Sequence, residues 1–204
     1  MTIYCIEQNY LATAGTRRAA DELIIFVKDE QSLLPAGEPM TFAHFADQHL
    51  YCQAELAIRV RSDGHRIPVD DAGGYVDAVT TGINFIAIDI LDELNDLEVP
   101  WQQIKGWKNS SAVGEWFPAN SLPNLRDIQF CLYKNREMVQ MADSSQMLAG
   151  LHEIVAAVSN EYALKAGDII FTGSPGGGAQ LFAGDNLESF LDDDSALEIG
   201  IVEG

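Results

Sequence analysis

Positive charge is scarce in this sequence. It has 12 lysines and arginines against 31 aspartates and glutamates, which gives a formal net charge of -19 over 204 residues. A surface with this excess of negative charge repels phosphate backbones, so we expect no binding to nucleic acid. We interpret the acidic residues as a solvated surface. An acidic ligand would have to be held by a few specific cations and backbone donors.

Cysteines and long apolar runs are also few. Cys5, Cys52 and Cys131 lie far apart and form no CxxC motif, which argues against a zinc ribbon or a disulfide framework and favours a reducing compartment. No apolar run reaches the ~20 residues that span a bilayer. The N-terminus lacks the basic-then-apolar pattern of a secretory signal. We therefore expect a cytoplasmic protein that does not bind membranes.

The apolar residues that are present, 47% of the chain, suit a globular protein, and the length suits a single domain over residues 1–204. Short runs rich in β-branched and aromatic residues predict strands, and apolar residues at helical spacing predict helices. The predicted strands cover residues 3–7, 23–28, 51–60 and 82–91, one strand within 167–172, and strand pairs over 127–140 and 187–204. The predicted helices cover 12–22, 91–100 and 147–164, and a turn followed by a short helix is predicted for 62–79.

One segment, from Gly167 to Gly178 (GDIIFTGSPGGG), combines an apolar strand with a turn of small residues. Glycine allows positive φ and close approach of other groups, and Pro175 restricts one φ. Exposed N–H groups and hydroxyls at the end of a strand suit an anionic or oxygen-rich ligand. A tight loop between two strands of a β-rich domain has the same composition, so the segment by itself leaves both interpretations open.

Two of the predicted strands carry side-chain oxygens among apolar residues. Alternate residues of a strand share a face, so Gln53 and Glu55 lie side by side on one strand, and Asn84 lies near the start of the next. Taken singly, Gln53 and Asn84 are typical of strand residues whose amides are satisfied, and Glu55 of an ion-paired residue. Lys105 taken singly is typical of a solvated lysine.

Six segments in one order connect this sequence to a known family. GDIIFTGSPGGGAQLFAGDNLE resembles the "GD-(apolar)-TGTP-x-GVG-x-GD" signature of the fumarylacetoacetate hydrolase family. The other segments that resemble family motifs, in the family's order, are FVKDEQSLL, QAELAIRV, GINFIAID, IKGWKNSSAVGEWFP and LYKNREMVQMADSSQML. Because these segments cover essentially the whole chain, the sequence is identified as a member of this family.

The resemblance implies a fold and a chemistry. The fold is α+β and mainly β, a mixed β-sandwich or roll with flanking helices, usually in a homodimer. Family members hydrolyse, decarboxylate, hydrate or tautomerise acylpyruvates, related 2-oxo acids and β-diketones. A divalent metal, Mg²⁺ or Mn²⁺, chelates the substrate's oxygens and stabilises the enolate that forms. Two glutamates and one aspartate of the family supply the oxygen ligands that such a hard cation needs.

The sequence departs from this pattern at the implied metal site. The first glutamate of the family is Gln53 here, Glu55 keeps the second, and the aspartate aligns with Asn84. All three side chains still offer an oxygen, so Gln53, Glu55 and Asn84 are the candidate metal ligands. The loss of two negative charges should weaken the binding of a dication severely.

Other family positions are partly lost and partly retained. The arginine of the family's "RD" pair aligns with Ile88, with Asp89 retained, and Thr13 stands where hydrolytic members have a catalytic histidine. Lys105 matches a lysine that reaches the substrate, and the resemblance makes it the candidate catalytic residue. The candidate substrate-binding residues are those of the TG(S/T) turn, namely Thr172, Gly173 and Ser174.

Two functions remain open at this stage. The first is a working enzyme that acts on a small 2-oxo acid or β-diketone with a weakly bound metal. The second is a catalytically impaired homologue that binds a metabolite or a protein partner, because the metal carboxylates, the arginine and the histidine are replaced together. Fold membership does not decide between them.

Overall fold

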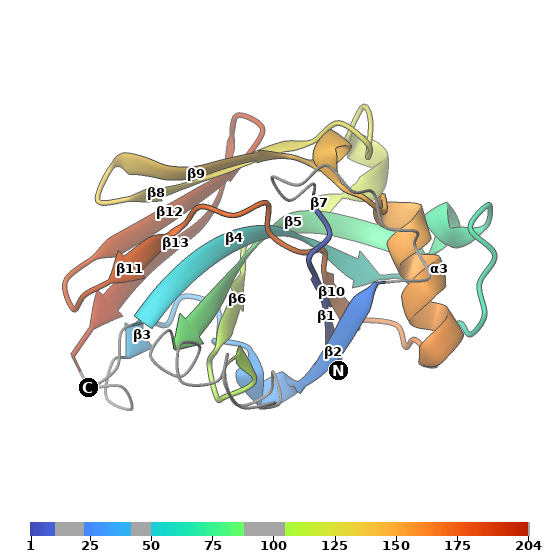
Figure 1. Cartoon of the computed structure of the whole chain (residues 1–204), viewed down its shortest axis with the longest axis horizontal. Coiled ribbons are helices and arrows are strands. Elements are labelled where there is room, and N and C mark those ends of the chain that lie inside the picture. The colour runs from blue at the N-terminus through green and yellow to red at the C-terminus, as the bar shows by residue number, and fades with distance from the viewer. Residues whose placement is uncertain (11–22, 42–49, 88–104, 204) are drawn as a thin grey trace.

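In the part of the chain that the structure describes, two β-sheets pack against each other, and helix α3 lies at the end of the larger sheet (Figure 1). The computed structural model describes residues 1–10, 23–41, 50–87 and 105–203. Within these residues the larger sheet has the strand order β2-β1-β10-β4-β5-β6, with β11 also paired to β4 and β7 to β5. The smaller sheet has the order β3-β13-β12-β8-β9. Both sheets are mixed, so the prediction of an α+β, mainly β fold is confirmed.

The strands of the larger sheet are β1 (Thr2–Glu7), β2 (Ile24–Asp29), β4 (Leu50–Val60), β5 (Val76–Ala87), β6 (Ser111–Val113), β7 (Phe117–Pro118), β10 (Ile169–Phe171) and β11 (Ala179–Leu181). The strands of the smaller sheet are β3 (Met40–Thr41), β8 (Gln129–Lys134), β9 (Glu137–Asp143), β12 (Asn186–Leu191) and β13 (Asp194–Val202). The helical elements are α3 (Leu151–Glu161) and the 3-10 turns η2 (Glu30–Ser32), η3 (Ala72–Tyr75), η4 (Ala119–Ser121) and η5 (Ser144–Gln146).

The antiparallel pair β4 and β5 is the centre of the larger sheet. Most residues of both strands are buried on either face, which matches their dense Val, Ile, Leu and Ala content. The main core lies where the buried faces of the two sheets meet α3, and its central side chains include Leu56, Phe85, Phe130 and Ile154. Burial of this apolar surface, at about 25 cal/mol per Å², is the main term that holds the sheets together.

Two of the predicted elements have different boundaries in the structure. The short helix predicted within 62–79 is only the 3-10 turn η3, and β5 already begins at Val76 rather than at residue 82. Gly73 and Gly74 are poor helix formers, and the residues after them alternate and pair with β4. The prediction of a strand here is therefore confirmed, but the predicted strand starts six residues after the observed one.

The helix predicted over 147–164 is also shorter than expected, because α3 spans Leu151–Glu161. Residues 147–149 are held by Asn9 instead, whose side chain accepts from the Ala149 N–H (2.9 Å) and donates to the Ala149 carbonyl (3.0 Å). Glu153 then closes the first turn by accepting from the Gly150 N–H at 2.7 Å. Apolar spacing alone does not reveal this competition from a distant side chain.

The predicted strand pair over 127–140 is confirmed as β8 and β9. Asn135 and Arg136, which join them, both have positive φ (52° and 71°), as a two-residue type I′ hairpin turn requires. The strand pair predicted at the end of the chain is β12 and β13. The helices predicted over 12–22 and 91–100, and Thr13, Ile88 and Asp89, lie outside the described residues.

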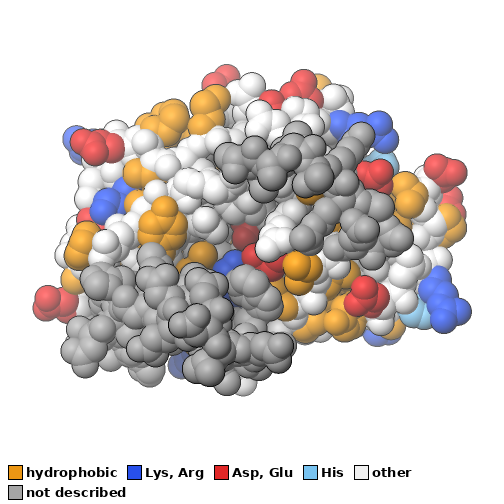
Figure 2. Space-filling view, viewed as in Figure 1, with side chains coloured by type: hydrophobic (Ala, Val, Ile, Leu, Met, Phe, Trp, Pro, Cys, Tyr) orange, Lys and Arg blue, Asp and Glu red, His pale blue; other side chains and the backbone are white. Residues whose placement is uncertain are grey.

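Acidic side chains are scattered over the face shown in Figure 2 rather than gathered in one patch, as expected for a solvated acidic surface. In the described part of the chain, no helix has the length and apolarity to cross a membrane.

Candidate active site

The three candidate metal ligands project from one face of the β4–β5 pair. Gln53 lies directly opposite Asn84 in the register, and Glu55 is two residues further along β4. Glu55 and Asn84 are in contact, because Asn84 Nδ2 donates to Glu55 Oε1. Gln53 makes a different contact, since its Nε2 donates to the Gly177 carbonyl at 3.3 Å. The strand period therefore predicted the shared face, and the structure decides which side chains meet.

Glu55 is a buried carboxyl group, only 2% exposed. Its second oxygen, Oε2, accepts from the Gly173 N–H at 2.8 Å, which ties β4 to the glycine-rich turn. Burial raises the pKa of Glu55 to about 7, and the nearby charge of Glu7 acts in the same direction. A carboxyl group with this pKa can both accept and release a proton near neutral pH.

Lys28 is buried and contacts Asn84, although it was not selected from the sequence. Glu55, Asn84 and Lys28 together are called the buried cluster. Its ammonium donates to Asn84 Oδ1 (2.8 Å) and to Ser111 Oγ (2.7 Å), with longer contacts to the Ser110 carbonyl and hydroxyl. Burial lowers the pKa of Lys28 to about 8. A lysine within the apolar run of residues 23–28 was the signal that could have marked this residue.

Lys105 forms a buried ion pair with Glu7, the last residue of β1. Lys105 Nζ and Glu7 Oε1 are 2.7 Å apart, and both side chains are largely buried. The charges of Glu7 and Lys105 both act on the pKa of Glu55, so this ion pair lies near Glu55. Glu7 was not selected from the sequence, although it ends a strand whose inner residues are apolar and buried.

The turn after β10 faces the same cluster. The N–H of Thr172 (3.0 Å) and its hydroxyl (2.8 Å) both donate hydrogen bonds to the Leu56 carbonyl. Gly173 has φ +96°, and a Cβ there would lie 3.0 Å from the Ile6 carbonyl, so only glycine fits without strain. Ser174 Oγ accepts from Gln140 Nε2 at 2.9 Å and from the Gly176 N–H at 3.3 Å, which leaves the hydroxyl proton to be donated elsewhere.

Gln140, on β9 of the other sheet, fills a gap beside β4. On this side β4 pairs with β11 at its start and with β10 near its end, and the turn 172–178 leaves the sheet between them. The Gln140 amide accepts from the Ala54 N–H (2.8 Å) and donates to the Ala54 carbonyl (2.9 Å). The side chain thus replaces one peptide unit of a missing strand, and it holds Ser174 with the same amide.

Comparison with known proteins places this cluster in context. A family model described as "Fumarylacetoacetate (FAA) hydrolase C-terminal" matches residues 2–203. The chain belongs to the fumarylacetoacetate hydrolase family. It is 27% identical over 194 residues to the mitochondrial oxaloacetate tautomerase of Caenorhabditis elegans, covering 94% of this chain and 90% of that protein. It is 26% identical over 189 residues to the Homo sapiens mitochondrial oxaloacetate tautomerase, covering 92% and 85%.

Solved structures of the family share the whole fold. Fumarylpyruvate hydrolase from Pseudomonas aeruginosa, solved with Mn²⁺ and pyruvate, superposes with a TM-score of 0.88 at 24% identity, covering 100% of this chain and 90% of that one. The 5-carboxymethyl-2-hydroxymuconate delta-isomerase from Mycobacterium smegmatis superposes with a TM-score of 0.86 at 22% identity, covering 100% and 79%. Isomerases and hydrolases therefore share this architecture, and the fold does not decide the reaction.

The family's divalent metal does not fit the side chains present. Asn84 Oδ1, one of the three candidate ligands, already accepts from Lys28 and from Ser111. Gln53 contributes no charge and turns its amide toward Gly177. Among the described residues no group of three or more His, Cys, Asp or Glu side chains could hold a metal ion. Glu55 is the one charged oxygen ligand left among the three candidates, which weakens the binding of a hard dication.

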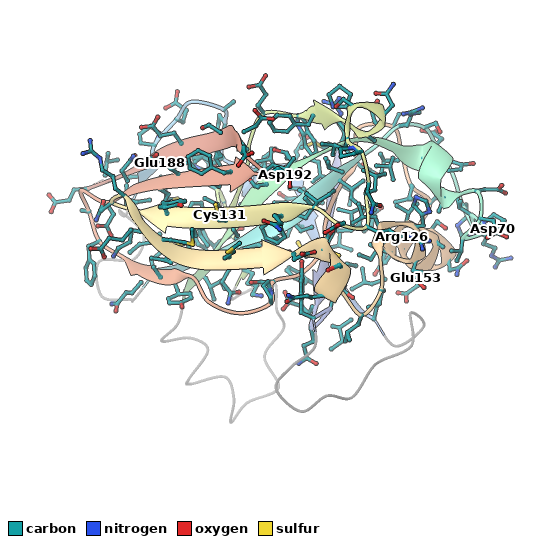
Figure 3. The ribbon with its side chains drawn as sticks, turned by 90° about the horizontal axis from the view of Figure 1, so that it is seen from above. Asp70, Arg126, Cys131, Glu153, Glu188 and Asp192 are labelled. Atoms are coloured by element: carbon teal, nitrogen blue, oxygen red, sulfur yellow. The ribbon has the colours of Figure 1, made fainter. Side chains whose placement is uncertain are left out.

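Two surface pockets lie away from this cluster. One of about 390 Å³, beside the start of α3, is lined in part by Arg126 and Glu153. The other, of about 340 Å³, lies on the outer face of β8 and β12 and is lined in part by Cys131, Glu188 and Asp192, as Figure 3 shows. Neither pocket includes a candidate site residue.

Proposed function

We propose that the protein binds a small 2-oxo acid and catalyses keto–enol tautomerisation, the transfer of a proton between carbon and oxygen beside the keto group. One observation carries this proposal. A buried carboxyl group, Glu55, lies against the Gly173 backbone of the family's substrate turn, next to the buried pair of Lys105 and Glu7. Similarity over most of the chain to oxaloacetate tautomerases supports the same reaction class.

Tautomerisation makes modest chemical demands. One group removes a proton from the carbon beside the keto group, the electron pair moves to the keto oxygen, and that oxygen takes up a proton to give the enol. We assign the removal of the proton to Glu55. Lys105 supplies a positive charge for the carboxylate of the acid, and the Ser174 hydroxyl is a donor for the oxygen that becomes negative.

A buried polar group without a partner supports a ligand beside Glu55. Among the described residues, the Tyr10 hydroxyl is the buried side-chain group that has no hydrogen-bond partner. Tyr10 lies near enough to Glu55 that its pKa is raised, first by burial and then by the charge of Glu55. Unpaired buried hydroxyls are rare in folded proteins, so a water molecule or a ligand atom is expected there.

The test is an assay of oxaloacetate tautomerisation, following the ultraviolet absorbance of the enol in the presence of EDTA. We expect acceleration over buffer, and a loss of about 100-fold or more for Glu55→Gln, the size of a general acid–base contribution. Glu137→Gln is the matched control, because Glu137 is exposed on β9. A wild-type rate equal to that of buffer, or an undiminished rate for Glu55→Gln, would contradict the proposal.

Calorimetry with pyruvate separates this function from the alternative of a homologue that binds without turnover. Binding of pyruvate together with no acceleration of tautomerisation would favour that alternative. Among the described residues, its only support is the replacement of family carboxylates by Gln53 and Asn84. A homodimer stays a prediction from the family resemblance, and a cytoplasmic location stays a prediction from the sequence. The Mg²⁺ or Mn²⁺ that the resemblance implies does not fit the side chains present.

A further inference from the structure

Glu7 places a carboxylate of the protein against the lysine that is assigned to the ligand. Its Oε1 lies 2.7 Å from Lys105 Nζ, and the side chains of Glu7 and Lys105 are only 12% and 6% exposed. A contact of this length between opposite charges is a charge-assisted hydrogen bond, which is stronger than one between neutral groups. The ammonium assigned to the carboxylate of a 2-oxo acid therefore already holds a carboxylate.

The position of Glu7 follows from the pairing of β1 with β10. The two strands run parallel, so the end of β1 lies beside the turn that follows β10. A Cβ on Gly173 would lie 3.0 Å from the Ile6 carbonyl, which shows how closely the end of β1 approaches this turn. Glu55 accepts from the N–H of the same Gly173. The backbone of the sheet thus holds Glu7 beside the candidate site.

The side chain of Glu7 shares a face of the larger sheet with that of Glu55. Alternate residues of a strand share a face, and Cys5, two residues before Glu7, packs in one apolar cluster with Ala57, two residues after Glu55. Burial raises the pKa of Cys5 to about 12, and the charges of Glu55, Glu7 and Lys105 also act on it. The site therefore holds two carboxyl groups, and the carboxylate of a ligand meets both.

We propose that Glu7 is a specificity-determining residue, an internal carboxylate that competes with the carboxylate of the ligand for Lys105 and so lowers the affinity for anionic ligands. A 2-oxo acid binds by displacing Glu7 from the ammonium or by sharing it, and both weaken an ion pair that a neutral ligand leaves intact. This inference rests on the proposed function in one respect, the assignment of Lys105 to the carboxylate of the ligand.

Calorimetry with pyruvate and pyruvamide tests the competition. The two molecules have nearly the same shape, but pyruvamide carries a neutral amide where pyruvate carries a carboxylate. Glu7→Gln removes the internal charge with little change in volume. We expect it to tighten pyruvate binding at least about tenfold and to change pyruvamide binding by less than about twofold. An unchanged affinity for pyruvate, or an equal gain for both molecules, would overturn the inference.

Asp63→Asn is the matched control, because Asp63 pairs with Lys165 at 2.8 Å on the exposed surface. It removes the same charge from the protein as Glu7→Gln, and we expect it to leave the affinity for pyruvate unchanged. An equal gain in both variants would be an effect of net charge and would contradict the inference. Combining Glu7→Gln with Lys105→Met should abolish the gain, and a gain that persists would show that the competition is not for Lys105.

Glu7→Asp takes the place of Glu7→Gln if circular dichroism shows that the latter is unfolded. Its shorter side chain keeps the charge but draws it back from Lys105, so pyruvate binding should still tighten at least about threefold. Tighter binding without acceleration of tautomerisation would contradict only the proposed function. Acceleration that depends on Glu55, with the same affinity for pyruvate in wild type and Glu7→Gln, would contradict only this inference. No binding of pyruvate to either protein would contradict both.

Discussion

Replacing Gln140 by leucine tests how the two sheets are joined at the candidate site. The Gln140 amide satisfies both the N–H and the carbonyl of Ala54, and it donates to Ser174 Oγ. Leucine has a similar volume but no polar atoms, so the variant leaves two buried backbone groups of Ala54 unpaired. Each unpaired buried group costs about 1–3 kcal/mol, so we expect the free energy of unfolding to fall by about 2–6 kcal/mol.

The assay is equilibrium unfolding in urea, followed by tryptophan fluorescence and by circular dichroism. Gln129→Leu is the matched control, because Gln129 is exposed on β8 of the same hairpin and should change stability by less than about 0.5 kcal/mol. A loss of less than about 1 kcal/mol for Gln140→Leu would refute the reasoning, since it would mean that Ala54 finds other partners.

Gln140→Glu adds a test of which half of the amide matters. An ionised carboxylate still accepts from the Ala54 N–H but cannot donate to the Ala54 carbonyl, whereas a protonated carboxyl group has one O–H to donate. The difference in unfolding free energy from wild type should therefore shrink as the pH falls below about 5. A difference that does not change with pH would show that the donor half contributes little.

Three further predictions concern charge and backbone geometry. The pKa of Glu55 is raised to about 7 and that of Lys28 is lowered to about 8. Thermal melts should therefore show that stability falls as the pH rises from about 4.5 to 7 and recovers between about 8 and 10.5. A Glu55→Gln, Lys28→Met double variant should lose this minimum in stability. Gly178→Ala should cost more than about 1 kcal/mol in urea, because φ is +103° and a Cβ would lie 2.1 Å from a β4 carbonyl; Gly74→Ala, with nothing within 4 Å, should be near neutral. Burial tends to raise the pKa of Asp185, but its hydrogen bonds hold that pKa below the usual range, so Asp185→Asn should cost about 1–2 kcal/mol at pH 7 and progressively less as the pH falls below 3.8.

The sign of the first of these three predictions follows from proton binding. Between about 4.5 and 7 the folded state holds the Glu55 proton more tightly than the unfolded state, so raising the pH removes stability. Between about 8 and 10.5 the unfolded state holds the Lys28 proton more tightly, so raising the pH restores stability. Each shift corresponds to roughly 3 kcal/mol, and the experiment measures their combined curve. If stability does not change with pH over this range, burial in the folded state does not shift the pKa values of Glu55 and Lys28.

Strand-forming segments and the family were determined by the sequence itself. Runs such as residues 23–28 and 51–60 have the β-branched content and the alternation of strands because each strand must bury its own side chains, and this pattern is local. The two-residue period also placed Gln53 and Glu55 on one face. The collinear motifs identified the family, which the match over residues 2–203 shows.

The contacts that define the candidate site were decided only by the tertiary structure. Asn9 shortens α3 from 140 residues away, and Gln140 completes the edge of β4 from the other sheet. Lys28 reaches Asn84 across 56 residues of sequence. These polar groups are selected by the need to satisfy buried donors, acceptors and charges that the packing of the sheets creates, and that need is not written in the local pattern around any one of them.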